Sequence, residues 1–251
     1  MLRSFLTKPE GGMPWLGLAL PVWVLAGFIF AQVVVGLILS VFELTGVKFD
    51  GINSAVFQAT LSAVIYVLSL FVVIGLPWIV KKFRTTARDL GLDHFPKWSH
   101  LLWAPIGFIV YIFLSYFFTA IAMLTPFYDN TSTQDVGFAN LNFGFEYFVA
   151  FVTLVIIAPV AEEILFRGYL LGKLRKNLQL WASILITSIL FAIVHLNFNV
   201  GVDVFALSIV LCILRVRTNS LWPSILLHMT KNGIAFYFLF INPLLLPTLG
   251  G

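Results

Sequence analysis

Charged side chains are scarce in this sequence. They make up 10% of its 251 residues, whereas 60% are hydrophobic; an average soluble domain carries about 25% charged residues. A single water-soluble domain cannot hide that much apolar surface, so the composition excludes the soluble class. The single cysteine, Cys212, lies inside an apolar run. A disulfide framework and a cysteine-rich metal site are therefore excluded as well.

Several protease signatures are also missing. The sequence has no His-Glu-x-x-His motif, no Gly-x-Ser-Gly nucleophile motif, and no pair of aspartates within its apolar runs. No small-residue cleavage site follows the first apolar run, which is longer than the core of a signal peptide. We therefore expect that run to be a retained membrane anchor.

Long apolar runs dominate what is present. Three of them lack Asp, Glu, Lys, Arg and His altogether, and each exceeds the roughly 20 residues that a helix needs to cross the hydrocarbon: 16–42, 55–80 and 101–125. Four weaker runs follow, at 145–172, 178–197, 203–214 and 221–242. The sequence predicts an all-α fold, a polytopic transmembrane helical bundle of about seven spans. The run at 203–214 is short for a full crossing, so we expect it to be tilted, extended or partly re-entrant.

The chain divides into two parts by the character of these runs. Residues 1–126 hold the first three spans and a segment from Arg84 to Leu92 that mixes basic residues with leucines. That segment fits a short interfacial helix on the headgroups, and fits a solvated loop equally well. Residues 145–242 hold the four weaker spans, where we expect a polar catalytic cavity.

The basic residues give the chain a formal charge of +4. They lie mostly in short connections rather than on one face, which argues against a nucleic-acid partner. Lys and Arg gather in alternate connections, at 81–100, 173–177 and 215–220. By the positive-inside rule this pattern predicts an integral protein of the bilayer with its N-terminus inside. The short connections favour a bacterial cytoplasmic membrane.

Two adjacent carboxylates follow the apolar run from Tyr147 to Ala161. An ionisable group at membrane depth costs about 2.5 to 3.5 kcal/mol on insertion scales, so each one requires a partner or a function. Residues four apart share a helix face, so Glu163 can pair with Arg167 while Glu162 points elsewhere. The alternative is that both glutamates sit at the end of the span and reach towards water.

Two further polar sites interrupt the later spans. His195 ends an uncharged run, one turn after Phe191, and His228 and Asn232 lie four apart in the final apolar helix. Structural hydrogen bonds between helices are the alternative explanation for both sites. Ser220 is expected to cap that last helix, with Pro223 in its first turn. No role is assigned to Lys231.

The depths of these groups follow from counting at about 1.5 Å per residue. Glu163 and His228 both lie roughly 15 Å from a basic connection, and His195 lies roughly 25 Å from one. His195 therefore requires a tilt or a break in its helix if it is to meet the others. Asp203, which follows Gly201, is interpreted as a helix N-cap.

Three patterns taken in order carry a resemblance: Glu162-Glu163-x-x-x-Arg167, Phe191-x-x-x-His195 and His228-x-x-x-Asn232. Together they resemble the CAAX protease and bacteriocin-processing family, also called Abi. The sequence Ser220-Leu221-Trp222-Pro223 and the segment 88–92 are similar to that family as well. The core of the resemblance covers about 145–235.

The resemblance implies an endopeptidase that cuts peptides at or inside the membrane. It implies that Glu162 is the general base and that His195 shares the activation of the attacking water. His228 and Asn232 would stabilise the developing oxyanion. Glu163 and Arg167 would form the pair that orients the helix of the first glutamate.

A metal is a further question for this site. Two histidines and a carboxylate also match a catalytic zinc site, with Glu162, His195 and His228 as its candidate ligands. Residue types alone leave zinc open. We expect no obligatory metal or other cofactor, because Asn232 beside His228 suits an oxyanion site better than a zinc site.

Two other functions use the same residues. One is a non-catalytic membrane protein of the same fold, acting in bacteriocin immunity or regulation. The other is a proton-coupled transporter with the buried Glu and His as its relay, although the two halves of the chain show no repeat. For a peptidase, the expected partner is a membrane-associated peptide or protein, and bacterial leader peptides or pheromone precursors are suggested by analogy alone.

Overall fold

The computed structural model describes residues 7, 9–49, 51–81, 84–129, 138, 141 and 144–243. In this part of the chain every regular element is a helix, which confirms the predicted all-α class. Within the described residues, six helical segments are long and apolar enough to cross a bilayer: Leu16–Leu44, Ser54–Val80, Trp98–Ala122, Phe145–Leu174, Phe198–Thr218 and Trp222–Ile241. The apolar helix Leu180–Ile193 is shorter, so about seven membrane helices agree with the sequence.

Three of these segments change between α- and π-helical turns along their length. The second consists of α3 (Ser54–Leu70), η1 (Phe71–Gly75) and α4 (Leu76–Lys81). The fourth consists of α7 (Phe145–Phe151), η2 (Val152–Ile157), α8 (Ala158–Glu163), η3 (Ile164–Leu170) and α9 (Leu171–Leu174). The last consists of α12 (Trp222–Phe236) and η4 (Tyr237–Ile241). Because π-turns are frequent at functional sites, the short α8 between two of them marks the position of the glutamates.

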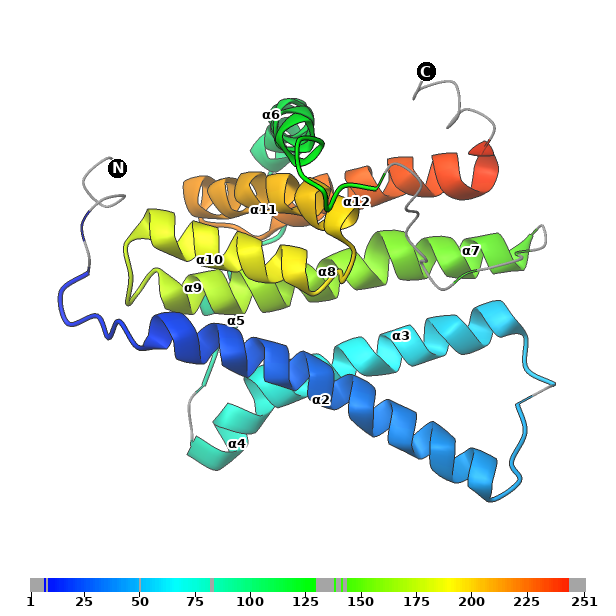
Figure 1. Cartoon of the computed structure of the whole chain (residues 1–251). Coiled ribbons are helices and arrows are strands. Elements are labelled where there is room, and N and C mark those ends of the chain that lie inside the picture. Colours follow the sequence, from blue (N-terminus) through cyan, green and yellow to red (C-terminus); the bar gives the residue numbers. More distant parts are fainter. Residues whose placement is uncertain are drawn as a thin grey trace.

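The helices form a bundle with the α7–α9 segment near its centre (Figure 1). α10 (Leu180–Ile193) and α11 (Phe198–Thr218) pack together, and α6 (Trp98–Ala122) packs across α11 and α12. α2 (Leu16–Leu44) and α3 lie on the opposite side and diverge towards the turn that joins them (Figure 1). Helices from 1–126 thus contact helices from 145–242, and the division of the chain at this boundary stays a prediction.

The apolar run at 203–214 is extended at both ends, and extension was one of the three expectations for so short a run. It lies in α11, whose 21 residues are enough for a full crossing. Its N-cap is Asn197, whose side chain accepts from the amide of Val200, so Asp203 lies inside the helix and is not its cap. The first turns of this helix contain polar residues at 197–203, so they do not form part of an apolar run in the sequence.

The last helix begins later than predicted. Its N-cap residue is Leu221, and Ser220 lies one residue further out, with its hydroxyl oxygen 3.4 Å from the amide of Trp222. Ser220 therefore approaches one exposed amide without occupying the capping position. Pro223 does fall in the first turn, as predicted.

A short helix in the 84–92 segment closes one end of the bundle. α5 (Ala87–Leu90) has a capping box between Thr86 and Asp89 and ends at Gly91, whose φ is 80°. Hydrogen bonds from the backbone amide and hydroxyl of Thr86, together with Lys176, hold the pKa of Asp89 well below its usual range. The carbonyl of Gly91 accepts from the amide of Leu221 at 2.9 Å, and the carbonyl of Asp89 accepts from buried Arg215 at 3.2 Å. This helix thus ties α11 and α12 together at their junction.

We expect Gly91→Ala to destabilise the protein more than Gly46→Ala. Both glycines have positive φ, which costs an L-residue about 1–2 kcal/mol. A Cβ on Gly91 would also lie 2.6 Å from the guanidinium carbon of Arg215, whereas a Cβ on Gly46 meets nothing within 4 Å. Thermal unfolding of the two purified variants in detergent measures the difference, and equal losses would contradict a role for the contact with Arg215.

Candidate active site

The adjacent glutamates on α8 face different surroundings. Glu163 is completely buried and accepts a hydrogen bond from Arg167 at 2.8 Å, four residues along the helix. This confirms the pair predicted from spacing. The side chain of Glu162 keeps 18% of its surface exposed and turns towards a cavity. One carboxylate is therefore neutralised in the interior, while the other is open to a ligand.

His228 connects the two glutamates. Its Nδ1 lies 2.9 Å from Glu163 Oε1, the oxygen that also binds Arg167. Because an ionised carboxylate only accepts, Nδ1 carries the proton in this contact. The opposite ring nitrogen, Nε2, lies 3.8 Å from Glu162 Oε2. The buried glutamate thus fixes the orientation of the imidazole and directs Nε2 towards the open glutamate.

Arg167 stacks on an aromatic ring. Its guanidinium carbon is 4.2 Å from the centroid of Phe191, and the side chain is completely buried. The same ring makes edge contacts with His195 and His228, at 4.9 and 5.9 Å between centroids. Within the described part of the chain, Arg167 Nε and Nη2 have no hydrogen-bond partner. The ring face therefore supplies part of the stabilisation that this buried cation needs.

His195 reaches the site because its helix breaks. α10 ends at Ile193, and Leu196 has a φ of 55°, which is unusual for a residue other than glycine. The break required by the depth estimate is therefore present. His195 Nδ1 lies 2.7 Å from the carbonyl oxygen of Phe191, which can only accept, so Nδ1 carries the proton and Nε2 is left as an acceptor.

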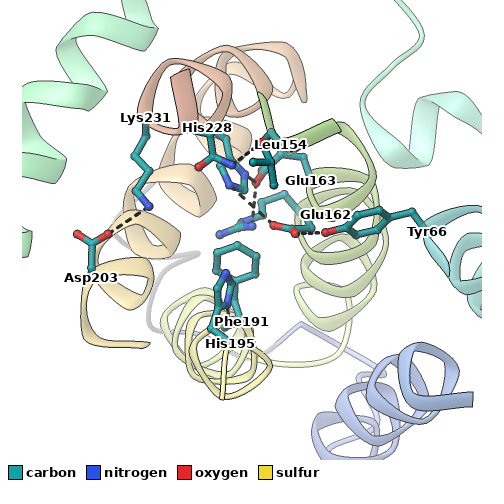
Figure 2. Close-up of polar contacts among 11 residues, drawn as sticks. Tyr66, Leu154, Glu162, Glu163, Phe191, His195, Asp203, His228 and Lys231 are labelled. Atoms are coloured by element: carbon teal, nitrogen blue, oxygen red, sulfur yellow. Dashed lines mark hydrogen bonds and ion pairs between the residues drawn. The ribbon is translucent and has the colours of Figure 1, made fainter. Parts of the chain in front are cut away.

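Tyr66 is a residue that the sequence analysis missed. It lies on α3, and its hydroxyl donates to Glu162 Oε1 at 2.6 Å (Figure 2). The signal that could have revealed it is the pair Ser62 and Tyr66, two polar residues four apart in a span without charges. Both face the same cavity.

These side chains surround a cavity of about 340 Å³. Its lining includes four of the predicted site residues, Glu162, His195, His228 and Asn232. The rest of the wall is largely aromatic and aliphatic. The polar members are Ser62, Tyr66, Thr153, Glu162, His195, His228, Lys231 and Asn232. Glu163 and Arg167 lie behind this wall. The three helices predicted to supply Glu162, His195 and His228 do bring them to one cavity.

Asn232 fills a gap that Pro159 creates in the neighbouring helix. The amide of Ala158 bonds the carbonyl of Thr153, five residues back, in the π-helical manner. In that pattern the carbonyl of Leu154 would accept from residue 159, and proline has no N–H. Asn232 Nδ2 donates to this carbonyl at 2.9 Å. The contact holds α12 in register with the helix that carries the glutamates and uses one amide hydrogen of Asn232.

Asp203 belongs to a second cluster of polar side chains, beside the cavity. Its Oδ1 accepts from the hydroxyls of Tyr111 and Ser115 on α6, at 2.7 and 2.6 Å. Its Oδ2 lies 3.4 Å from Lys231 Nζ on α12. The predicted N-cap is therefore a partly buried link between three helices, and Lys231 gains a partner.

A metal site would require several suitable ligands at one point. Among the described residues, no group of three or more His, Cys, Asp or Glu side chains is arranged to hold a metal ion. Glu162, His195 and His228 line one cavity without forming such a group. These three side chains are therefore not arranged as ligands of one metal ion.

The buried pair predicts a coupled effect of substitution. Glu163→Gln and Arg167→Met should each destabilise the protein by about 3–5 kcal/mol, because each leaves the other charge uncompensated. The double variant should recover most of that loss. Lys176→Met, which removes an exposed partner of Asp89, should cost about 1 kcal/mol or less. Chemical or thermal unfolding measures all four, and additive losses in the double variant would contradict the pairing.

Comparison with known proteins finds relatives of this core. Residues 144–234 match the model described as Type II CAAX prenyl endopeptidase Rce1-like. The membrane-embedded CAAX protease MroQ of Staphylococcus aureus is 28% identical over 218 residues, which cover 82% of this chain and 84% of MroQ. The putative membrane peptidase YdiL of Bacillus subtilis is 31% identical over 77 residues, 31% of this chain and 32% of YdiL.

A 24.3 kDa protein of Escherichia coli is 32% identical over 92 residues. That match covers 35% of this chain and less than half, 42%, of the E. coli protein. No solved structure matches the chain. The apolar helices and the membrane relatives agree that this is an integral membrane protein. The resemblance inferred from the sequence is confirmed: residues 144–234 are similar to the CAAX protease family model, and two of these relatives are named as a CAAX protease and a membrane peptidase.

Proposed function

We propose that this protein is an intramembrane endopeptidase that hydrolyses a peptide bond in a membrane-associated peptide or protein. The observation that carries the proposal is the convergence of Glu162, His195 and His228 on one largely apolar cavity. Amide hydrolysis needs a base for water and a donor for the tetrahedral oxygen, and both act more strongly where bulk water is excluded. The family match over residues 144–234 supports the same chemistry.

We assign each side chain a role that agrees with its contacts. Glu162 takes a proton from the attacking water while His195, through Nε2, accepts from the same water. The water oxygen bonds to the carbonyl carbon. His228 donates to the developing oxyanion through Nε2, for which its ring carries a proton on each nitrogen, with Glu163 beside Nδ1 and Glu162 beside Nε2 to balance the charge. Glu162 then returns its proton to the leaving nitrogen as the C–N bond breaks, so that water is the only molecule consumed.

The remaining polar residues position these groups. Glu163 and Arg167 orient His228 from behind the cavity wall. Asn232 keeps α12 in register with α8 through the carbonyl of Leu154, and its second amide hydrogen is available to the oxyanion. Tyr66 holds Glu162 Oε1 and so leaves Oε2 for water.

The orientation of the protein is part of the proposal. α5, Lys176 and Arg215 lie together at one end of the bundle through contacts with Asp89. We place this basic end, and with it the N-terminus, on the inner side of a bacterial cytoplasmic membrane.

Glu162→Gln tests the function directly. We expect it to reduce cleavage by about 10² to 10⁴-fold, the usual contribution of a general base. The measurement compares new peptide termini produced from bacterial membrane peptides by proteoliposomes of the wild type and the variant. Glu146→Gln is the matched control, since Glu146 lies on the same long helix at its first turn, and its activity should match that of the wild type.

Adding chelators to the same assay distinguishes water activation by glutamate from water activation by a metal ion. Cleavage that survives EDTA and 1,10-phenanthroline supports water activation by glutamate, and loss that Zn²⁺ restores would overturn it. A cellular phenotype that persists in the Glu162→Gln strain would instead favour the immunity or regulatory role.

Tyr66→Phe tests the added contact. A hydrogen bond to a charged group is worth about 1.5–3 kcal/mol, so kcat should fall by about tenfold to a hundredfold. KM should change little, because the phenol contacts the base rather than the substrate. Tyr169→Phe removes the hydroxyl of another buried tyrosine outside the cavity and should retain kcat. Equal rates for Tyr66→Phe and the wild type would contradict a positioning role.

A further inference from the structure

A lysine faces the same cavity as the proposed catalytic groups. Lys231 lies on α12 three residues after His228, and both side chains line the cavity. Its side chain keeps 19% of its surface exposed. Among the described residues that line the cavity, Lys231 is the only Lys or Arg; Arg167 lies behind the wall. The proposed hydrolytic mechanism assigns no role to this lysine.

Asp203, the partner of Lys231, accepts hydrogen bonds from other side chains as well. Asp203 Oδ1 accepts from two hydroxyls on α6, those of Tyr111 and Ser115. These two hydroxyls hold the carboxylate in place without help from the lysine. The carboxylate therefore keeps its position when the ammonium turns partly away from it.

The contact between Lys231 and Asp203 leaves donors free. Nζ lies 3.4 Å from Asp203 Oδ2, which is longer than the 2.7–2.9 Å of a strong charged hydrogen bond. An ammonium carries three N–H donors. Figure 2 shows Lys231 and Asp203 on the side of His228 opposite to Tyr66 and Glu162. A ligand between them and the catalytic groups would meet a cation on one side and a base on the other.

We propose that Lys231, held by Asp203, is a subsite for a carboxylate of the substrate. A carboxylate entering a largely apolar cavity is strongly disfavoured unless a cation meets it there. Lys231 supplies that cation at a fixed place. This inference rests on the proposed peptidase activity and names a feature of its substrates.

Helix geometry limits where the carboxylate lies. Side chains three residues apart on a helix are about 5–6 Å apart at their Cβ atoms, and an extended peptide advances roughly 3.3–3.6 Å per residue. The carboxylate therefore lies about one to two residues from the bond that is cut. An acidic side chain and a free C-terminus both supply this chemistry.

The experiment uses a library of peptides from digested bacterial membrane proteins. The full chain in proteoliposomes cuts the library, and termini that appear with the wild type and not with Glu162→Gln define the cleaved bonds. We expect a carboxylate within two residues of these bonds several times more often than in the library as a whole. Lys231→Met should abolish this enrichment and Lys231→Arg should retain it.

Matched synthetic peptides give the quantitative test. For a cleaved sequence, the ratio of kcat/KM between the Glu form and the Gln form should fall about tenfold in Lys231→Met, the effect of losing one charged hydrogen bond. The ratio does not depend on how much of the variant folds. A ratio equal to that of the wild type would overturn the subsite.

Two further outcomes separate the alternatives. Amidation of every peptide C-terminus removes the enrichment if the carboxylate is terminal and leaves it intact if it is a side chain, and either result supports the subsite. Cleavage that depends on Glu162 but shows no carboxylate enrichment overturns the subsite alone. No Glu162-dependent cleavage at all would overturn the proposed function, and the subsite with it.

Discussion

The carboxylate of Glu163 is the interaction on which the rest of the site depends. It is buried without any exposed surface, and one of its oxygens accepts from both Arg167 and His228. A charge in such a place persists only with close partners, because transfer from water to a low-dielectric interior costs several kcal/mol per ion. The partners in turn fix the site: Arg167 stacks on Phe191, and the ring of Phe191 contacts both histidines.

Much of the fold could be predicted from the sequence because a bilayer imposes simple requirements. Runs without ionisable residues at 16–42, 55–80 and 101–125 correspond to Leu16–Leu44, Ser54–Val80 and Trp98–Ala122. The pairing of Glu163 with Arg167 followed from the helical period alone. α11 was drawn too short, because a buried helix tolerates polar residues such as Asp203 when other helices supply their partners.

The rest of the site depends on contacts between segments far apart in the chain. Tyr66 and Glu162 are separated by 96 positions, and neither residue indicates the other in sequence. The role of Asn232 depends on a carbonyl that Pro159 leaves without an amide partner. Such a gap becomes visible only when the helical pattern around the proline is known. Spacing identifies residues on one helix face, and it does not identify which faces meet.

The contact of Tyr66 with Glu162 also bears on how much of the chain the proposed peptidase needs. The matched family core begins at residue 144, whereas the phenol that holds the proposed base comes from α3, far outside it. A fragment or chimaera limited to the four C-terminal helices would retain both glutamates and both histidines. It would lose a wall of the cavity and a ligand of its reactive carboxylate. In the proposed peptidase, α2 and α3 are therefore better regarded as part of the site than as an anchor attached to it.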